Sequence, residues 1–63
     1  HISTNVIVNG NVIIGNECFL GSSTVINNNI TLQDNIIIGS SSNVRKNIFE
    51  SGVYVGNPIV KIR

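Results

Sequence analysis

The sequence predicts an all-β solenoid, in which short parallel strands stack on their own repeats along the chain. Two columns of residues with a period of six support this fold class. The first column contains only branched aliphatic residues: Ile2, Val8, Ile14, Leu20, Ile26, Leu32, Ile38 and Val44. The second column follows four residues later with small or β-branched side chains: Val6, Val12, Cys18, Thr24, Ile30, Ile36, Ser42 and Ile48. A period of six excludes the 3.6-residue repeat of an amphipathic helix.

Strands and turns alternate within this period. The runs 6–8, 12–14 and 36–38 are rich in β-branched residues, which favour extended backbone. An ordinary β-sandwich would space its turns irregularly, whereas the register here holds from Ile2 to Ile48 and indicates a solenoid. The position after each aliphatic favours Gly and Asn, so we expect tight or left-handed backbone there. These positions are Ser3, Asn9, Gly15, Gly21, Asn27, Gln33, Gly39 and Arg45.

Over residues 2–49 the sequence resembles the hexapeptide-repeat family. The motif of that family is an aliphatic residue, a Gly-like residue, two free positions, a small residue and a free position. The resemblance implies a single-stranded left-handed parallel β-helix of about three coils, with three hexads in each coil. Residues eighteen apart would then stack at about 4.8 Å. Cys18 would point inward above Ile36 as a small buried side chain and not as a nucleophile. We therefore expect coils over 1–49 and a tail over 50–63 that packs on or closes the helix.

Composition excludes several function classes. A net charge of +1 gives no electrostatic surface for nucleic acid, and no apolar run approaches the roughly 18 residues of a membrane span. The single cysteine offers neither an intramolecular disulfide nor a zinc-binding spacing, and it suits a reducing, cytoplasmic setting. A chain of 63 residues buries only about 60% of its extended surface, so we expect partner subunits to contribute to the core.

The position before each first-column aliphatic should point outward, and it is mostly apolar. An exposed apolar surface of this kind indicates an interface. In the hexapeptide-repeat family this interface forms a parallel homotrimer, which the resemblance implies here. The outward residues are His1, Ile7, Ile13, Phe19, Val25, Thr31, Ile37 and Asn43.

A narrower resemblance concerns function. The runs 1–3, 10–15 and 16–21, together with the closing segment Gly56-Asn57-Pro58, are similar to the sialic acid O-acetyltransferase and UDP-4-amino-sugar N-acetyltransferase family. Ile59 departs from the alanine that usually follows the proline. The resemblance implies acetyl-CoA as co-substrate, bound along an edge between two subunits, and a sugar or nucleotide sugar as acceptor of acetyl. The positions carried over as cofactor contacts are His1, Gly21, Ser22, Gly39 and Ser40. Lys61 and Arg63 either meet CoA phosphates or form a solvated tail.

The catalytic base is not assigned. The family has two histidines in one coil, and His1 matches the second, which contacts the acetyl group; the first, the general base, would lie before residue 1. Alternatively, His1 is itself the base, because an imidazole suits deprotonation of a hydroxyl or ammonium group, or it is a terminal residue without function. One histidine excludes the three-histidine zinc site of γ-class carbonic anhydrases.

The remaining alternative is a non-catalytic structural or trimerisation module. Against it, such a module has no evident reason to keep the small pairs Gly21-Ser22 and Gly39-Ser40 beside a histidine. The residues do not distinguish transfer to nitrogen from transfer to oxygen, and they do not identify the acceptor.

Overall fold

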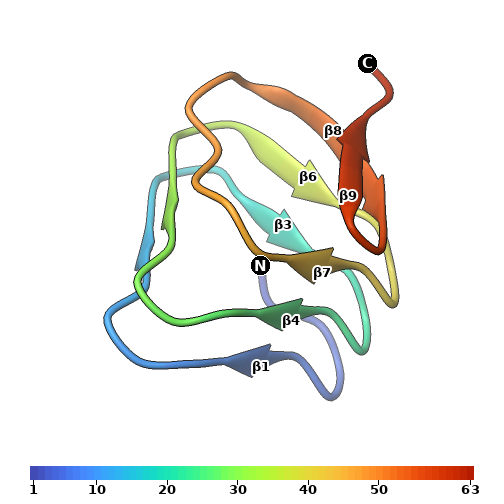
Figure 1. Cartoon of the computed structure of the whole chain (residues 1–63). Coiled ribbons are helices and arrows are strands. Elements are labelled where there is room, and N and C mark those ends of the chain that lie inside the picture. The colour runs from blue at the N-terminus through green and yellow to red at the C-terminus, as the bar shows by residue number, and fades with distance from the viewer.

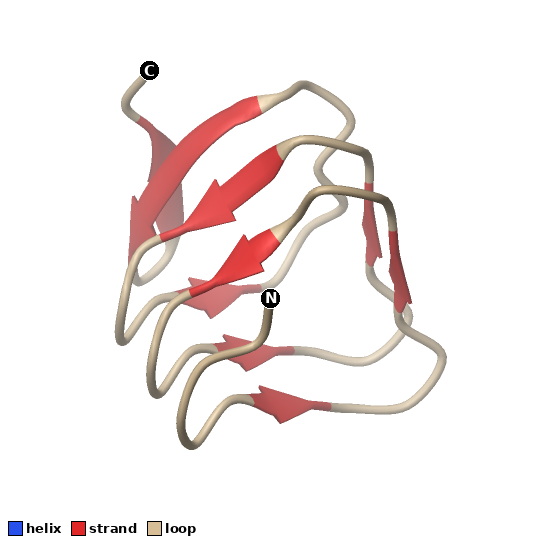
Figure 2. Ribbon diagram, turned by 180° about the vertical axis from the view of Figure 1, so that it is seen from behind, coloured by secondary structure: helices blue, strands red, loops and turns tan.

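The computed structural model describes all residues, 1–63, and contains strands and turns but no helix, so no helix could span a membrane. The chain winds repeatedly around one axis with a roughly triangular outline (Figures 1 and 2). Most strands span only two residues, because each side of the triangle accommodates one short extended run. They are β1 (Ile7–Val8), β2 (Ile13–Ile14), β3 (Phe19–Leu20), β4 (Val25–Ile26), β5 (Thr31–Leu32), β6 (Ile36–Ile38), β7 (Asn43–Val44), β8 (Gly52–Gly56) and β9 (Ile59–Lys61).

Three sheets form the sides of the prism, in the orders β1-β4-β7, β2-β5 and β3-β6-β8-β9. The pairs between successive coils are parallel. Ile7 pairs with Val25, and Val25 pairs with Asn43, so each partner lies eighteen residues further along the chain. Phe19 pairs with Ile37 at the same interval. The predicted parallel solenoid and its three-hexad coil are therefore confirmed.

The third coil is two residues shorter than predicted. Ile48 pairs with Leu32 of the first column, although the sequence pattern assigned Ile48 to the second column, so that assignment was wrong. The reason lies in the turn before it. The Asn47 side-chain oxygen accepts the Thr31 N–H at 2.8 Å, whereas one coil below the equivalent Ile13 N–H bonds to the Ile30 carbonyl at 2.9 Å. A side-chain amide thus replaces a backbone carbonyl and allows the shorter turn.

The two predicted columns form the core. In the upper coils the first-column side chains are at most 1% exposed: Leu20, Ile26, Leu32, Ile38 and Val44. Ile2 and Val8 are exposed because no coil lies beneath them. Cys18 is buried as predicted, and its thiol donates to the Gln33 carbonyl at 3.1 Å. Thr24 and Ser42 are buried, and each hydroxyl donates to the Gly39 carbonyl, so neither hydroxyl lacks a partner.

The left-handed backbone falls at a different position from the one predicted. It lies three residues after each aliphatic, not directly after it, and none of Gly15, Gly21 and Gly39 has a positive φ. One left-handed residue per corner turns the chain into the next side of the prism. Asn occupies four of the seven sites because its short polar side chain tolerates this conformation better than most residues. The sites, all at φ between 58° and 61°, are Asn5, Asn11, Glu17, Ser23, Asn29, Asn35 and Ser41.

Glu17 is the residue least suited to its left-handed site. Its φ is 58°, and its carboxylate makes no hydrogen bond or ion pair that would offset the strain. Changing Glu17→Asn is therefore expected to raise the free energy of unfolding by about 0.5–1 kcal/mol. Urea denaturation measures it. Gln33→Asn, at an exposed position without positive φ, should change stability by less, and an equal gain from both would contradict the φ argument.

The C-terminal residues continue the third sheet and then fold back. β8 pairs in parallel with β6, and β9 returns antiparallel to β8. Tyr54 of β8 faces inward, and its hydroxyl donates to the Glu50 carbonyl at 2.6 Å. Burial raises the pKa of Tyr54 above its usual value, and the charge of Glu50 acts in the same direction. Ile59 packs against the core, so the β8–β9 hairpin covers the upper end of the hydrophobic column.

Candidate functional site

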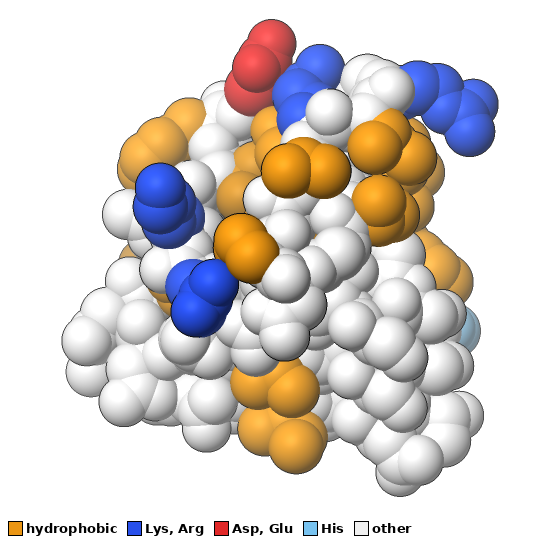
Figure 3. Space-filling view, turned by 45° about the vertical axis from the view of Figure 1, so that its right-hand side comes forward, with side chains coloured by type: hydrophobic (Ala, Val, Ile, Leu, Met, Phe, Trp, Pro, Cys, Tyr) orange, Lys and Arg blue, Asp and Glu red, His pale blue; other side chains and the backbone are white.

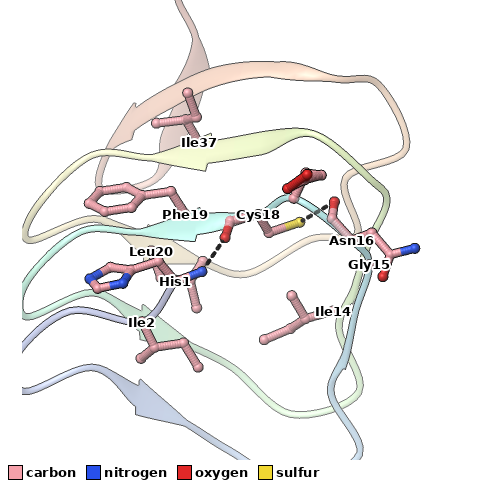
Figure 4. Close-up of a pocket in the computed structure, with 10 residues that line it drawn as sticks. His1, Ile2, Ile14, Gly15, Asn16, Cys18, Phe19, Leu20 and Ile37 are labelled. Atoms are coloured by element: carbon pink, nitrogen blue, oxygen red, sulfur yellow. Dashed lines mark hydrogen bonds between the residues drawn. The ribbon is translucent and has the colours of Figure 1, made fainter.

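His1, Phe19 and Ile37 lie in one column on the outer face of the sheet β3-β6-β8-β9. The amino nitrogen of the His1 backbone donates to the Cys18 carbonyl at 2.6 Å, and the Leu20 N–H donates to the His1 carbonyl at 2.8 Å. These two bonds fix the His1 backbone directly below Phe19. Their rings are stacked, with centroids 5.3 Å apart and planes 7° from parallel, and Ile37 lies above them (Figure 4). The structure therefore brings the predicted outward column together.

A hollow of about 590 Å³ adjoins this column and is lined mostly by residues of the first coil. Its outer wall includes His1, Phe19 and Ile37, whereas Ile2 and Ile14 belong to its inner side. Both imidazole nitrogens of His1 are free of hydrogen bonds to the rest of the chain. The imidazole is thus available to a ligand as a hydrogen-bond donor or acceptor.

The predicted edge with Ser22 and Ser40 forms the neighbouring corner of the prism. The Ser22 carbonyl accepts the Ser41 N–H at 2.8 Å, and the Thr4 carbonyl accepts the Ser23 N–H at 2.9 Å. The amides of Ser22 and Ser40 themselves donate to no group of the chain. Ser40 is exposed and Ser22 is half-buried. One coil apart, these two N–H groups have no hydrogen-bond partner within the chain.

Gly21 and Gly39 have a packing reason that the sequence did not reveal. A Cβ atom at Gly21 would lie 2.6 Å from the Ser40 nitrogen, and one at Gly39 would lie 2.5 Å from the Val55 Cγ1 atom. A small residue is therefore required at Gly21, where the contact is with backbone, whereas at Gly39 the close contact is with a side chain of the next strand. Gly21 and Gly39 therefore do not discriminate between an enzyme and a structural module, and the expectation that a structural module has no reason to keep these glycines is wrong.

Charged groups are sparse around the column. The Nζ atom of Lys61, in the β8–β9 hairpin, lies 4.0 Å from the carboxylate of Glu50. Arg45 and Lys46 have no acidic partner within that distance. Figure 3 shows the Lys and Arg side chains spread from the top of the molecule to about its middle, with an acidic side chain beside one of them at the top. No group of three or more His, Cys, Asp or Glu side chains lies together as a metal site would require.

From the sequence, Phe19 was predicted only to point outward. The signal was nevertheless present, because a spacing of eighteen residues places Phe19 directly above His1 once the coil length is known. The stacking itself depends on side-chain rotation, which the spacing does not record.

Solved structures identify the fold. The chain superposes over its whole length on PerB from Caulobacter crescentus, crystallised with CoA and GDP-perosamine, with a TM-score of 0.95 and 22% identity. It superposes over 98% of its length on the acetyltransferase domain of PglB from Neisseria gonorrhoeae, with a TM-score of 0.94 and 24% identity. That domain has also been crystallised with acetyl coenzyme A. No protein-family model matches the sequence, and no curated protein matches it.

A third solved structure has a higher sequence identity. A maltose O-acetyltransferase from Clostridium difficile is 40% identical over 82% of this chain, with a TM-score of 0.79. The chain spans only 30%, 30% and 28% of the three proteins' own lengths. The fold is therefore the left-handed parallel β-helix of these acetyltransferases, and the predicted resemblance to hexapeptide-repeat acetyltransferases is confirmed.

Proposed function

We propose that this chain is the acetyl-CoA-binding part of an acetyltransferase that moves acetyl to an amino or hydroxyl group of a sugar or nucleotide sugar. The observation that carries the proposal is its superposition, with TM-scores of 0.94–0.95, on proteins crystallised with CoA or acetyl-CoA. The identity of 40% to a maltose O-acetyltransferase supports a sugar as acceptor. Because the chain spans about 30% of those proteins, the proposal concerns its contribution to the whole activity.

In this proposal the edge binds the cofactor through backbone amides. The free N–H groups of Ser22 and Ser40 donate to carbonyl oxygens of the pantetheine arm, which extends along the coils. Gly21 allows the Ser40 backbone to approach closely, and so keeps the two amides one coil apart. The binding energy holds the thioester close to the acceptor, which is how positioning accelerates a transfer between two substrates.

The acyl transfer itself is a direct attack. The acceptor amine or hydroxyl forms a bond to the thioester carbonyl, a base takes its proton, and the carbon–sulfur bond breaks to release CoA. The His1 imidazole, free of other hydrogen bonds, donates to the acetyl oxygen and stabilises the charge that develops there. The base is a second group; the alternative is that His1 itself takes the proton.

The proposal includes a homotrimer. The outer face of the sheet β3-β6-β8-β9 exposes Phe19, Ile37, Val60 and Ile62. A neighbouring subunit would cover this apolar face and complete the cofactor groove. A cytoplasmic location fits both a supply of acetyl-CoA and the free thiol of Cys18.

Acetyl-CoA titration by calorimetry tests the proposed edge. The unmodified chain is expected to bind saturably, and Ser40→Trp is expected to weaken binding at least about tenfold because the indole fills the path of the pantetheine arm. Asn28→Trp is the matched control, since Asn28 occupies the same place in its hexad and is exposed, but lies at another corner.

The mass in solution is measured on all three proteins. A folded trimer that binds no acetyl-CoA would contradict the proposal and favour the structural module. Equal loss of binding in both tryptophan variants would place the ligand elsewhere than on this edge.

A further inference from the structure

The orientation of the His1 ring depends on one aromatic neighbour. Hydrogen bonds at Cys18 and Leu20 fix the His1 backbone, but the imidazole nitrogens have no partner in the chain. The Phe19 ring lies parallel to the imidazole within 7°, at a centroid separation of 5.3 Å. This separation is close to the spacing of about 4.8 Å between stacked strands, so the register of the coils brings the two rings face to face.

We propose that Phe19 is a positioning residue that sets the plane of the His1 imidazole for its contact with the acyl group of acetyl-CoA. The inference rests on the proposed function. An imidazole donates and accepts hydrogen bonds only within the plane of its ring. With the ring held parallel to that of Phe19, its N–H group lies in a plane across the stacking direction, and its hydrogen bonds are directed to the side of the stack.

The alternative role of Phe19 is simply to cover the subunit interface. Ile37 separates the two roles, because it occupies the same outward column one coil higher and is 45% exposed against 40% for Phe19. A role in apolar contact between subunits would be shared by both residues. A role in orienting the imidazole belongs to Phe19 alone, since Phe19 and not Ile37 is stacked on His1.

Nuclear magnetic resonance of the imidazole protons tests the stack directly. The chain has one histidine, so its ring signals are unambiguous. In the unmodified chain the Phe19 ring current is expected to shift them upfield. Phe19→Leu should remove the shift, whereas Phe19→Tyr, which keeps the ring, and Ile37→Leu should retain it. Circular dichroism and mass in solution establish that each variant keeps its fold and assembly.

Acetyl-CoA calorimetry on the same proteins tests the consequence. Phe19→Leu is expected to weaken binding roughly two- to tenfold, the loss that corresponds to one aromatic stack, and Phe19→Tyr should restore it. Unchanged imidazole shifts in Phe19→Leu would overturn the stack. A lost shift with unchanged affinity would overturn the positioning role. If the unmodified chain binds no acetyl-CoA, the proposed function and this role both fail, while the imidazole shifts still report separately whether the rings stack.

Discussion

Changing Ile38→Ala is expected to lower the free energy of unfolding by about 3–5 kcal/mol, because it opens a cavity in the centre of the prism. Ile38 is fully buried and pairs with Leu20 in the coil below and with Tyr54 in the strand above. A chain of this length has a total stability on the order of 3–9 kcal/mol. The variant should therefore lose a large part of the total stability, which urea titration followed by far-UV circular dichroism would show as a much lower midpoint.

The neighbouring residue provides the control. Ile37 lies in the same strand, β6, but points outward and is 45% exposed. Ile37→Ala is expected to cost less than about 1 kcal/mol, because the removed atoms are already partly in water. Denaturation at several protein concentrations separates this intrinsic effect from loss of assembly. Similar losses in the two variants would mean that the assignment of inner and outer faces is wrong.

The regular part of the fold could be predicted because the same physical demand recurs in every hexad. An interior position such as Leu20 or Ile26 must fill the same triangular cross-section, and only branched aliphatics of similar volume do so. The six-residue column therefore predicts which side chains are buried. The coil length of eighteen came from resemblance and not from the column, since a period of six alone does not say how many hexads close a turn.

The irregular part could not be predicted from side-chain size. In the shortened third coil the Thr31 amide donates to the Asn47 side chain, and an asparagine in a turn does not by itself indicate such a bond. The left-handed positions were misplaced for a related reason. Glycines such as Gly21 suggest conformational freedom, but here they meet a steric demand, while left-handed backbone is adopted by residues such as Asn29 and Ser41.

The candidate site was only partly accessible to sequence reasoning. The columns containing His1 and Ser40 follow from the spacing, and the structure places both on the outside of the prism. Which amides are free depends on the pairing of each turn with the next coil. The acceptor leaves no recognisable pattern, because a sugar is bound by scattered polar groups with no fixed spacing in one repeat.

Changing Gly21→Ala is expected to destabilise the chain by about 1–3 kcal/mol, the usual cost of inserting a methyl group into closely packed structure. The added Cβ would lie 2.6 Å from the Ser40 nitrogen and 2.9 Å from the Ile38 oxygen. Both atoms belong to backbone, so the second and third coils must move apart. That movement also displaces the Ser40 amide, and acetyl-CoA binding should weaken together with stability.

Gly10→Ala makes this prediction stringent, because it should change stability in the opposite direction. No atom lies within 4 Å of a Cβ at Gly10, and its φ is not positive. Alanine there should stabilise the chain by about 0.4–1 kcal/mol by restricting the unfolded state. Thermal denaturation of both variants measures whether each substitution raises or lowers the stability of the chain. If Gly21→Ala also stabilises the chain, the second and third coils stand further apart at this corner than the structure has them. The close approach of the Ser40 backbone to Gly21, on which the proposed cofactor edge depends, would then be wrong.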